Sequence, residues 1–333
     1  MTRIVVVGDL MTDTVARAAL PLVKGSDTPA AVTAHGGGSG ANIAAWLAVD
    51  GAEVAFVGRR GADIAGRNRD MELMGYGVDA RLVMDPERPT GTCVVMITHK
   101  GDNTMLSDPG ANAALSPDDL PQDLFTPGCH LHMSGYTLLN EGSRPAAMTA
   151  MDYARQADMT ISVDGASVAP LERVGAEPYL EMTNGATLLF VNAAQAAVLT
   201  GRDDPAQAAR VLTAWYPQVV VKLGPDGALF ANGRPEAIRA PAQVVEHPVD
   251  GTGGGDAFCA GFLIPWLDKK PPLEALDSGC RLAARARSLV GARPAVRPPC
   301  PSEVLPGGPG APPWRPPGPG PAPSRGRCPS FRR

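Results

Sequence analysis

The sequence predicts an α/β fold in which helices cover a mainly parallel sheet. Three observations lead to this prediction. Short β-branched runs alternate with helical patterns over the first 294 residues, as is typical of α/β units. The 333 residues can bury a sizeable core in one large domain or in two smaller ones. Hydrophobic residues make up 44% and charged residues 19%, which favours a globular protein over a disordered one.

The individual elements follow in chain order. The run from Ile4 to Val7 predicts a first strand, and the apolar residues after each of two glycine clusters predict helices. Strands are expected over residues 3–8, 53–58, 128–133, 160–164, 187–191 and 218–223. Helices are expected over residues 40–50, 63–75, 143–157, 193–200, 205–214, 254–267 and 273–290. The segment from Ala80 to Leu106 alternates with period two around turn-forming residues at 100–103, which indicates an antiparallel hairpin in a small separate sheet.

Charge and composition exclude several classes of function. A net charge of -4 gives no overall attraction to nucleic acid or to an anionic membrane. The chain opens directly on a strand and contains no run of eighteen apolar residues, so we expect a cytoplasmic protein without a membrane span. The six cysteines lack Cys-x-x-Cys spacing, which predicts reduced structural residues. The histidines are interpreted as ordinary pocket or surface residues: His35, His99, His130, His132 and His247.

The composition changes near residue 294. Half of the 40 residues from Pro294 to Arg333 are proline or glycine, which build neither helix nor sheet. We therefore expect a disordered tail over residues 295–333. A dispensable extension, a proline-rich ligand segment, a basic arm and a frame-shifted end all fit this composition.

The first glycine cluster spans residues 36–42, with the sequence Gly-Gly-Gly-Ser-Gly-Ala-Asn, and runs directly into a predicted helix. Glycines before a helix let the backbone approach a ligand, and the helix N-terminus presents unpaired amides. The spacing is neither a dinucleotide-binding fingerprint nor a P-loop. Taken alone, the cluster also fits a purely structural turn.

The second cluster spans residues 250–258, with the sequence Asp-Gly-Thr-Gly-Gly-Gly-Asp-Ala-Phe. Consecutive glycines at a helix start form a row of N–H donors that suits an anion. Asp256 lies in this row. A carboxylate beside a bound phosphate is repelled by it, so its presence indicates a function such as accepting a proton from an attacking hydroxyl. In isolation, Asp256 also fits a simple helix cap.

With these two clusters the chain resembles the ribokinase-like (PfkB) carbohydrate kinases. Further matches to the family's N-terminal signature are Asn42, Ala44, Gly51 and Gly61. The second cluster is similar to the C-terminal signature Asp-Thr-x-Gly-Ala-Gly-Asp, with Gly251 and Gly254 as departures. Residues 89–92 (Pro-Thr-Gly-Thr) and 110–116 (Gly-Ala-Asn-Ala-Ala-Leu-Ser) are very similar to ribokinases. The resemblance covers residues 1 to about 294.

The resemblance implies a ribokinase-like three-layer αβα sandwich with a small β-sheet lid. The kinase domain would span residues 1–294, with the lid contributed by roughly 10–35 and 80–110. The implied reaction is transfer of the γ-phosphate of ATP to a hydroxyl of a small-molecule sugar. Asp256 would be the catalytic base, and the amides of Gly253, Gly254 and Gly255 would form the anion hole. The positions that hold sugar hydroxyls in the family carry Asp13, Gly37, Gly38 and Asn42 here.

The resemblance also implies a nucleotide site and two metal sites. ATP contacts are implied for Asn192, Lys222, Gly224 and Gly227. Lys222 fits either a phosphate contact or an ordinary surface lysine. The family has a Glu that helps to hold Mg²⁺ through water where this chain has Gln195, so we expect weaker metal organisation. Many members bind a monovalent cation such as K⁺. Asp250 and Thr252 match the first half of that site, whereas Arg287 and Arg293 crowd the second half.

Other interpretations stay open. The segment 133–136 is similar to nucleoside and 2-keto-3-deoxygluconate-type kinases, and Tyr136 would suit stacking on a base or a sugar ring. Gln195 and the altered C-terminal end also fit a non-catalytic sugar sensor, although a sensor has no need for Asp256 as a base. Edge pairing of the lid would give a homodimer, and an edge that is blunted within one chain would not.

Overall fold

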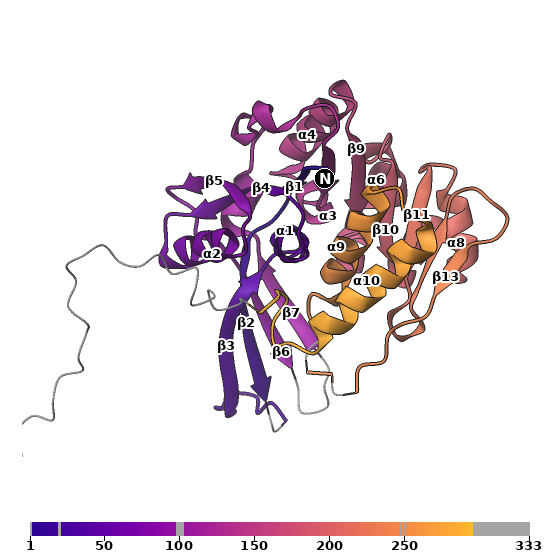
Figure 1. The fold of residues 1–333 in the computed structure, drawn as a ribbon. Coiled ribbons are helices and arrows are strands. Elements are labelled where there is room, and N and C mark those ends of the chain that lie inside the picture. Colours follow the sequence, from indigo (N-terminus) through magenta and orange to yellow (C-terminus); the bar gives the residue numbers. More distant parts are fainter. Residues whose placement is uncertain (1, 19–20, 98–102, 247, 250, 296–333) are drawn as a thin grey trace, which may run out of the picture. The chain divides into compact units, whose positions relative to one another are not determined.

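The computed structural model describes residues 2–18, 21–97, 103–246, 248–249 and 251–295. They form a nine-stranded sheet and a separate four-stranded sheet (Figure 1). The large sheet contains β1 (Ile4–Val7), β4 (Val54–Gly61), β5 (Asp79–Asp85), β8 (His130–Met133), β9 (Thr160–Asp164), β10 (Leu188–Asn192), β11 (Gln218–Lys222), β12 (Ala228–Ala231) and β13 (Ile238–Ala240). The small sheet contains β2 (Met11–Ala18), β3 (Ala30–Gly37), β6 (Gly91–Ile97) and β7 (Asn103–Asp108).

The strands of the large sheet follow the order β13-β12-β11-β10-β9-β8-β1-β4-β5. Neighbours from β11 to β5 pair in parallel, whereas β12 and β13 add two antiparallel strands at one edge. The first strand of the chain lies inside the sheet, with Ile4 opposite Val54 on one side and His130 on the other. The carboxyl ends of the parallel strands therefore meet at one edge, where ligands of such sheets bind.

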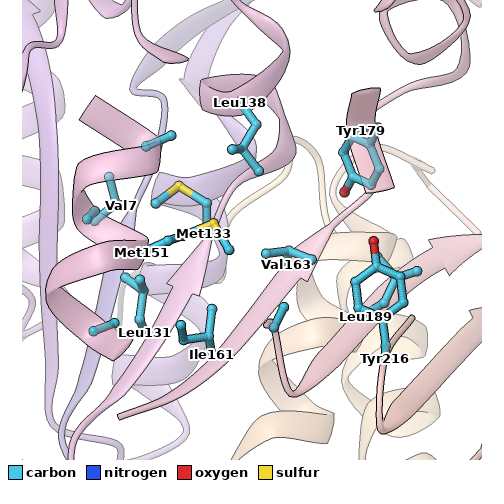
Figure 2. Packing of buried hydrophobic residues seen from close by; sticks show 14 of the residues in the cluster. Val7, Leu131, Met133, Leu138, Met151, Ile161, Val163, Tyr179, Leu189 and Tyr216 are labelled. Carbon is cyan, nitrogen blue, oxygen red and sulfur yellow. The ribbon is translucent and has the colours of Figure 1, made fainter. Parts of the chain in front are cut away.

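Helices cover both faces of the large sheet because successive side chains of each strand point to opposite faces. Val5 and Val7 belong to a core that includes residues of α3 (Gly135–Leu139), α4 (Arg144–Gln156), α5 (Val168–Val174), α6 (Ala176–Met182), α7 (Ala193–Thr200) and α8 (Pro205–Leu212). Ile4 and Val6 belong to a second core that includes residues of α1 (Ser39–Val49), α2 (Ile64–Gly75), α9 (Gly254–Leu267) and α10 (Pro272–Arg287). Figure 2 shows the first of these cores, where Met151 of α4 faces side chains of several strands. The predicted three-layer αβα sandwich is confirmed.

The small sheet has the order β3-β2-β6-β7. β2 pairs in parallel with β6, and the other two pairings are antiparallel. Its own core consists of Met11, Val15, Cys93 and Val95, with Ile97 packed against it. The β6–β7 pair is the predicted hairpin, and residues 98–102 of its predicted turn lie outside the described residues.

Several elements differ from the sequence prediction. Residues 79–85 were expected in the lid, but they form β5 at the edge of the large sheet, in parallel with β4. The alternating pattern of this segment fits a half-buried edge strand in either sheet, so only the long-range pairing decides. The short elements α3, α5, α6, β12 and β13 were not predicted, and α10 ends at Arg287 rather than at residue 290.

The described residues belong to one compact unit that ends at Ala295. The predicted tail over 295–333 lies outside the described residues from Val296 onward, so the domain boundary stays a prediction. In the described part of the chain, no helix is both long and apolar enough to cross a membrane. The described cysteines are free thiols: Cys93, Cys129, Cys259 and Cys280.

Candidate active site

The largest concentration of polar residues singled out above lies at the carboxyl edge of the large sheet. A pocket of about 630 Å³ opens there between the N-termini of α1 and α9 and the small sheet. Asp256, Asp13, Asn42, Gly38 and Gly253 all line it. The structure thus brings together residues from both glycine clusters that lie more than 200 positions apart in sequence.

Asp256 lies in the first turn of α9 and has two side-chain partners from α1. The Ser39 hydroxyl donates to Oδ1 at 2.8 Å, and the Asn42 amide Nδ2 donates to Oδ2 at 2.9 Å. Burial raises the pKa of Asp256 to about 7, although the bonds from Asn42 and Ser39 and the charge of Lys222 oppose this rise. A carboxylate with a pKa near neutrality is suited to general-base chemistry.

The glycines of the second cluster allow the backbone to turn into α9. Gly253 is the N-cap residue with φ of 74°, a left-handed conformation that favours glycine. A side chain at Gly253 would also overlap the backbone of Ala292. Gly254 and Gly255 form the first turn of α9, where backbone amides lack helical partners. This geometry is compatible with the anion hole, which stays a prediction.

The acceptor residues predicted from the first cluster lie on the small-sheet side of the pocket. Asp13 of β2 is 8% exposed and contacts Gly37 so closely that any side chain at Gly37 would overlap its carboxylate. Gly38 has φ of 90° and packs against the carbonyl of Asp9. Asn42, in contrast, uses both ends of its amide within the protein, because Nδ2 bonds to Asp256 and Oδ1 accepts from Arg293.

At the positions predicted to contact the nucleotide and Mg²⁺, Asn192 and Gln195 form a reciprocal cap of α7. Asn192 Oδ1 accepts from the Gln195 amide at 2.8 Å, and Gln195 Oε1 accepts from the Asn192 amide at 2.8 Å. The Gln195 Nε2 donates to the carbonyl of Ala166. Both ends of the Gln195 amide therefore bond within the fold, as does the oxygen of the Asn192 amide. Gly224 and Gly227, with φ of 61° and 89°, form the tight turn after β11.

Lys222, at the end of β11, reaches from the large sheet to the start of α9. Its Nζ lies 3.5 Å from the carbonyl oxygen of Gly255 and 3.6 Å from Cys259 Sγ. Burial alone would lower the pKa of this ammonium, but Cys259, Asp164 and Asp256 outweigh burial and raise it. Lys222 therefore holds a positive charge beside the glycine nest.

Two carboxylates of this edge, the half-buried Asp9 and the buried Asp164, carried no signal in the sequence motifs. Asp9 follows β1 and accepts from the amides of Ser39 and Gly40, both at 3.1 Å, while burial raises its pKa. Asp164 ends β9, and His132 Nε2 lies 3.5 Å from its Oδ2. Burial would raise the pKa of Asp164, but the bond and charge of His132 lower it overall. A signal that could have identified both is their position, because each lies at the carboxyl end of a buried parallel strand.

The histidine interpretation needs one correction. His130 and His132 are fully buried in β8 and are not surface residues. Both rings bond to the Ser162 hydroxyl at 2.8 Å. The strand pairing of β8 with β9 places these polar side chains opposite each other, which the single strands could not reveal. His99 and His247 lie outside the described residues.

Comparison with known proteins identifies the family of the chain. The model of the pfkB family carbohydrate kinases matches residues 1–298. The chain belongs to this family. The ATP-dependent ribose-1-phosphate kinase of Halopiger xanaduensis is 28% identical over 89% of this chain and 95% of its own length. The fructokinase structure from Vibrio cholerae O395, with fructose, ADP and calcium ion bound, has 27% identity and a TM-score of 0.74, covering 89% of this chain and 96% of its own.

A third comparison concerns the fold alone. The adenosine kinase structure from Sinorhizobium meliloti has a TM-score of 0.80 at 23% identity, with 89% of this chain and 96% of that chain covered. The predictions of a ribokinase-like fold and of a sugar kinase acting on a small molecule are thus confirmed. Membership of the family implies the use of ATP and of a divalent cation. The roles of individual residues, Mg²⁺ and K⁺ stay predictions.

Proposed function

We propose that this pfkB kinase transfers the γ-phosphate of ATP to a sugar hydroxyl that is activated by Asp256. The observation that carries this proposal is the carboxylate itself. Asp256 lies at a glycine-rich helix N-terminus, lines the pocket and has a pKa of about 7. Near neutral pH it can accept the hydroxyl proton as the oxygen attacks phosphorus.

The two carboxylate oxygens of Asp256 have separate partners, and these partners set its direction. Ser39 and Asn42 donate to different oxygens from the first turn of α1. Two fixed donors hold the carboxylate plane while leaving further lone pairs for a hydroxyl. The acceptor would be held by Asp13 from β2 and by the backbone at Gly37 and Gly38. A buried carboxylate distinguishes hydroxyl donors in a way that an apolar pocket does not.

The transferring phosphoryl group would lie at the start of α9. The amides of Gly253, Gly254 and Gly255 supply donors, and the helix dipole adds a partial positive charge. Lys222 supplies a full positive charge from the opposite side of Gly255. Phosphoryl transfer depends mainly on positioning and charge neutralisation. The glycine amides, the helix dipole and Lys222 would provide both for the phosphoryl group. The turn at Gly224 and Gly227 would lie along the nucleotide.

We propose that the protein itself organises Mg²⁺ only weakly. Gln195, the position with the implied water-mediated contact, uses its side chain within the α7 cap and on Ala166. No group of three or more His, Cys, Asp or Glu side chains among the described residues is arranged to hold a metal ion. The steps proposed above are assigned to the protein's own residues. For K⁺, Asp250 lies outside the described residues and Thr252 lines the pocket, so this site stays a prediction.

A nucleoside-type acceptor is the second candidate, and the pocket wall favours it. Met11, Val95, Met105 and Leu139 contribute apolar side chains to the same pocket. Tyr136 lines it as well and is 37% exposed, so its ring is available for stacking. A free hexose would leave much of this apolar wall unused, whereas a planar aglycone would cover it. The two candidates share the base and differ only in the acceptor.

The small sheet also supports a proposal about assembly. Its edge strand β3 is largely exposed from residue 30 to residue 34, including Val32, which is 62% exposed. An exposed edge strand pairs readily with another chain. Pairing through β3 would give a homodimer. Sedimentation of the wild type and of Val32→Lys tests this, because a charged side chain on an exposed edge strand hinders pairing with another chain; a monomeric wild type would refute it.

The test of the main proposal measures ADP release against sugars, sugar acids and nucleosides. Asp256→Asn should lower turnover at least ~10²-fold for the best acceptor while nucleotide binding holds. Asp268→Asn, at the other end of α9, is the matched control and should change nothing. Near-normal turnover of Asp256→Asn would remove this residue from the mechanism. A nucleoside as best acceptor would decide for the second candidate.

A further inference from the structure

The segment 291–294, which follows α10, is fixed to the body of the fold at several points. The Trp46 indole donates to the carbonyl of Ala292 at 2.9 Å, and the Tyr76 hydroxyl donates to the carbonyl of Pro294 at 2.8 Å. Between these anchors, Arg293 is only 5% exposed. A buried guanidinium requires partners for its donors, and those partners show what it does.

The three partners of Arg293 come from three different elements. Nε donates to Asn42 Oδ1 at 3.2 Å, and Nη2 donates to the carbonyl of Gly37 at 2.8 Å. Nη1 lies 3.1 Å from Glu72 Oε2, an ion pair that compensates the buried charge. Arg69 Nη1 lies 3.0 Å from the same Glu72 oxygen. The guanidinium therefore touches the acceptor turn and the Asn42 amide at the same time.

The contact with Asn42 decides which way its amide faces. A guanidinium has donors only, so the Asn42 atom that it meets must be the oxygen. The Asn42 nitrogen then faces Asp256 Oδ2, at 2.9 Å. The flipped amide would set donor against donor at Arg293 and oxygen against oxygen at Asp256. Both contacts therefore select one orientation.

We propose that Arg293 is a positioning residue for phosphoryl transfer, which locks the Asn42 amide so that it donates to Asp256. This inference rests on the proposed role of Asp256. A second consequence concerns Gly37, because its carbonyl bonds to the same guanidinium while its α-carbon abuts the Asp13 carboxylate. Through these two contacts Arg293 fixes the position of Gly37 relative to Asn42, and hence to the proposed base Asp256. Arg293 itself contacts neither the acceptor nor the phosphate.

The pH dependence of kcat/KM separates this role from a merely structural one. Arg293→Met frees the Asn42 amide, and a carboxylate that loses a hydrogen bond becomes easier to protonate. The acid limb of the pH profile should therefore shift to higher pH by about one unit, and kcat/KM should be largely recovered at high pH. The other groups near Asp256 are Ser39 on α1, Lys222 on β11, Tyr136 on α3, Asp164 on β9 and Cys259 on α9, and all are retained.

A double-mutant comparison shows whether Arg293 acts through Asn42. Asn42→Ala alone should produce the same upward movement of the acid limb, and adding Arg293→Met should then move the limb no further. Arg293→Lys keeps the positive charge but not the planar set of guanidinium donors, so it should give a partial shift of the acid limb. Arg281→Gln, on the exposed side of α10, is the matched control and should leave the profile unchanged.

Three outcomes would overturn the inference: an Arg293→Met profile that is lowered equally at every pH, additive limb shifts in the double variant, or an unmoved limb. If Arg293→Met does not fold, the same criteria apply to Arg293→Lys. Failure of the proposed function would look different, because Asp256→Asn would then keep its turnover whatever the Arg293 variants do.

Discussion

The two sheets of this kinase are stabilised to very different extents. The large sheet is covered on both faces, and its two cores together contain nearly all the buried apolar side chains. The small sheet has four buried core residues and an exposed β3. The groups proposed to act on phosphate belong to elements packed on the large sheet, whereas Asp13 and much of the apolar pocket wall belong to the small sheet. The proposed chemistry thus lies in the region with the larger core, and the proposed acceptor contacts lie partly in the region with the smaller core.

The largest expected effect compares one substitution in the two cores. Val163→Ala in β9 removes buried methyl groups from a core that cannot collapse, so the free energy of unfolding should fall by about 2–3 kcal/mol. Val95→Ala in β6 should cost no more than about 1 kcal/mol, because the small sheet can relax, and should instead raise the KM of the acceptor. Denaturant unfolding and steady-state kinetics measure both. Equal losses of stability would break the comparison.

The next expected effect separates acceptor from nucleotide. Asp13→Ala, in the small sheet, should weaken acceptor binding by about 1–3 kcal/mol because hydroxyl partners are left unpaired, while the KM for ATP stays constant. Lys222→Met, in the large sheet, should raise the KM for ATP and leave acceptor binding unchanged. Binding measured by calorimetry for each ligand would sharpen the comparison. If Asp13→Ala weakened ATP binding instead, the first glycine cluster would have been assigned to the wrong substrate.

A smaller effect concerns the stability of the large-sheet region itself. Burial raises the pKa of Asp256 to about 7, so the folded state favours the protonated form. The stability associated with this group is present below pH 4 and is lost as the pH rises through 7. Asp256→Asn should therefore raise the free energy of unfolding by about 1–2 kcal/mol at pH 8 and by nothing at pH 4. Thermal melting at both pH values tests this, and equal effects at the two values would contradict it.

The smallest expected effect concerns the end of the large-sheet region. A chain shortened to end at Ala295 keeps all the contacts of Arg293 and Pro294, so its melting temperature should match that of the full chain. A chain that ends at Val290 loses those contacts and should melt lower. A clear fall for the chain ending at Ala295 would show that the predicted boundary near residue 294 is misplaced.

Much of the fold could be predicted because it depends on local patterns. The strands β8, β9, β10 and β11 and the helices α1, α2 and α9 lie within about two residues of their predicted bounds, since each carries an apolar run or period of its own. The exceptions depend on distant partners. Residues 79–85 alternate as a strand should, but membership of the large sheet is fixed only by pairing with β4. β13 has just three residues, too few for a pattern.

The candidate site divides in the same way. Asp256, Asp13, Gly38 and Gly253 carry spacing signals, and the structure places them around one pocket. Asn42 was predicted to contact sugar hydroxyls, yet its amide links Arg293 to Asp256, and no motif contains both ends of that link. Asp9 and Asp164 follow strands whose neighbours are set only by the sheet order. Spacing identifies groups that share a turn, whereas networks between elements require the tertiary structure.

The link between Asn42 and Arg293 joins residues 251 positions apart, and this has a consequence for biosynthesis. Domains fold from the N-terminus while translation proceeds at about 5–20 residues per second, so Asn42 leaves the ribosome roughly 10–50 s before Arg293. During that interval the strands from β1 to β11 can pair, but α9 with Asp256 and the segment that orients Asn42 are still to come. A nascent chain therefore acquires the proposed base Asp256 and the fixed Asn42 amide only after all the parallel strands of the large sheet have been made.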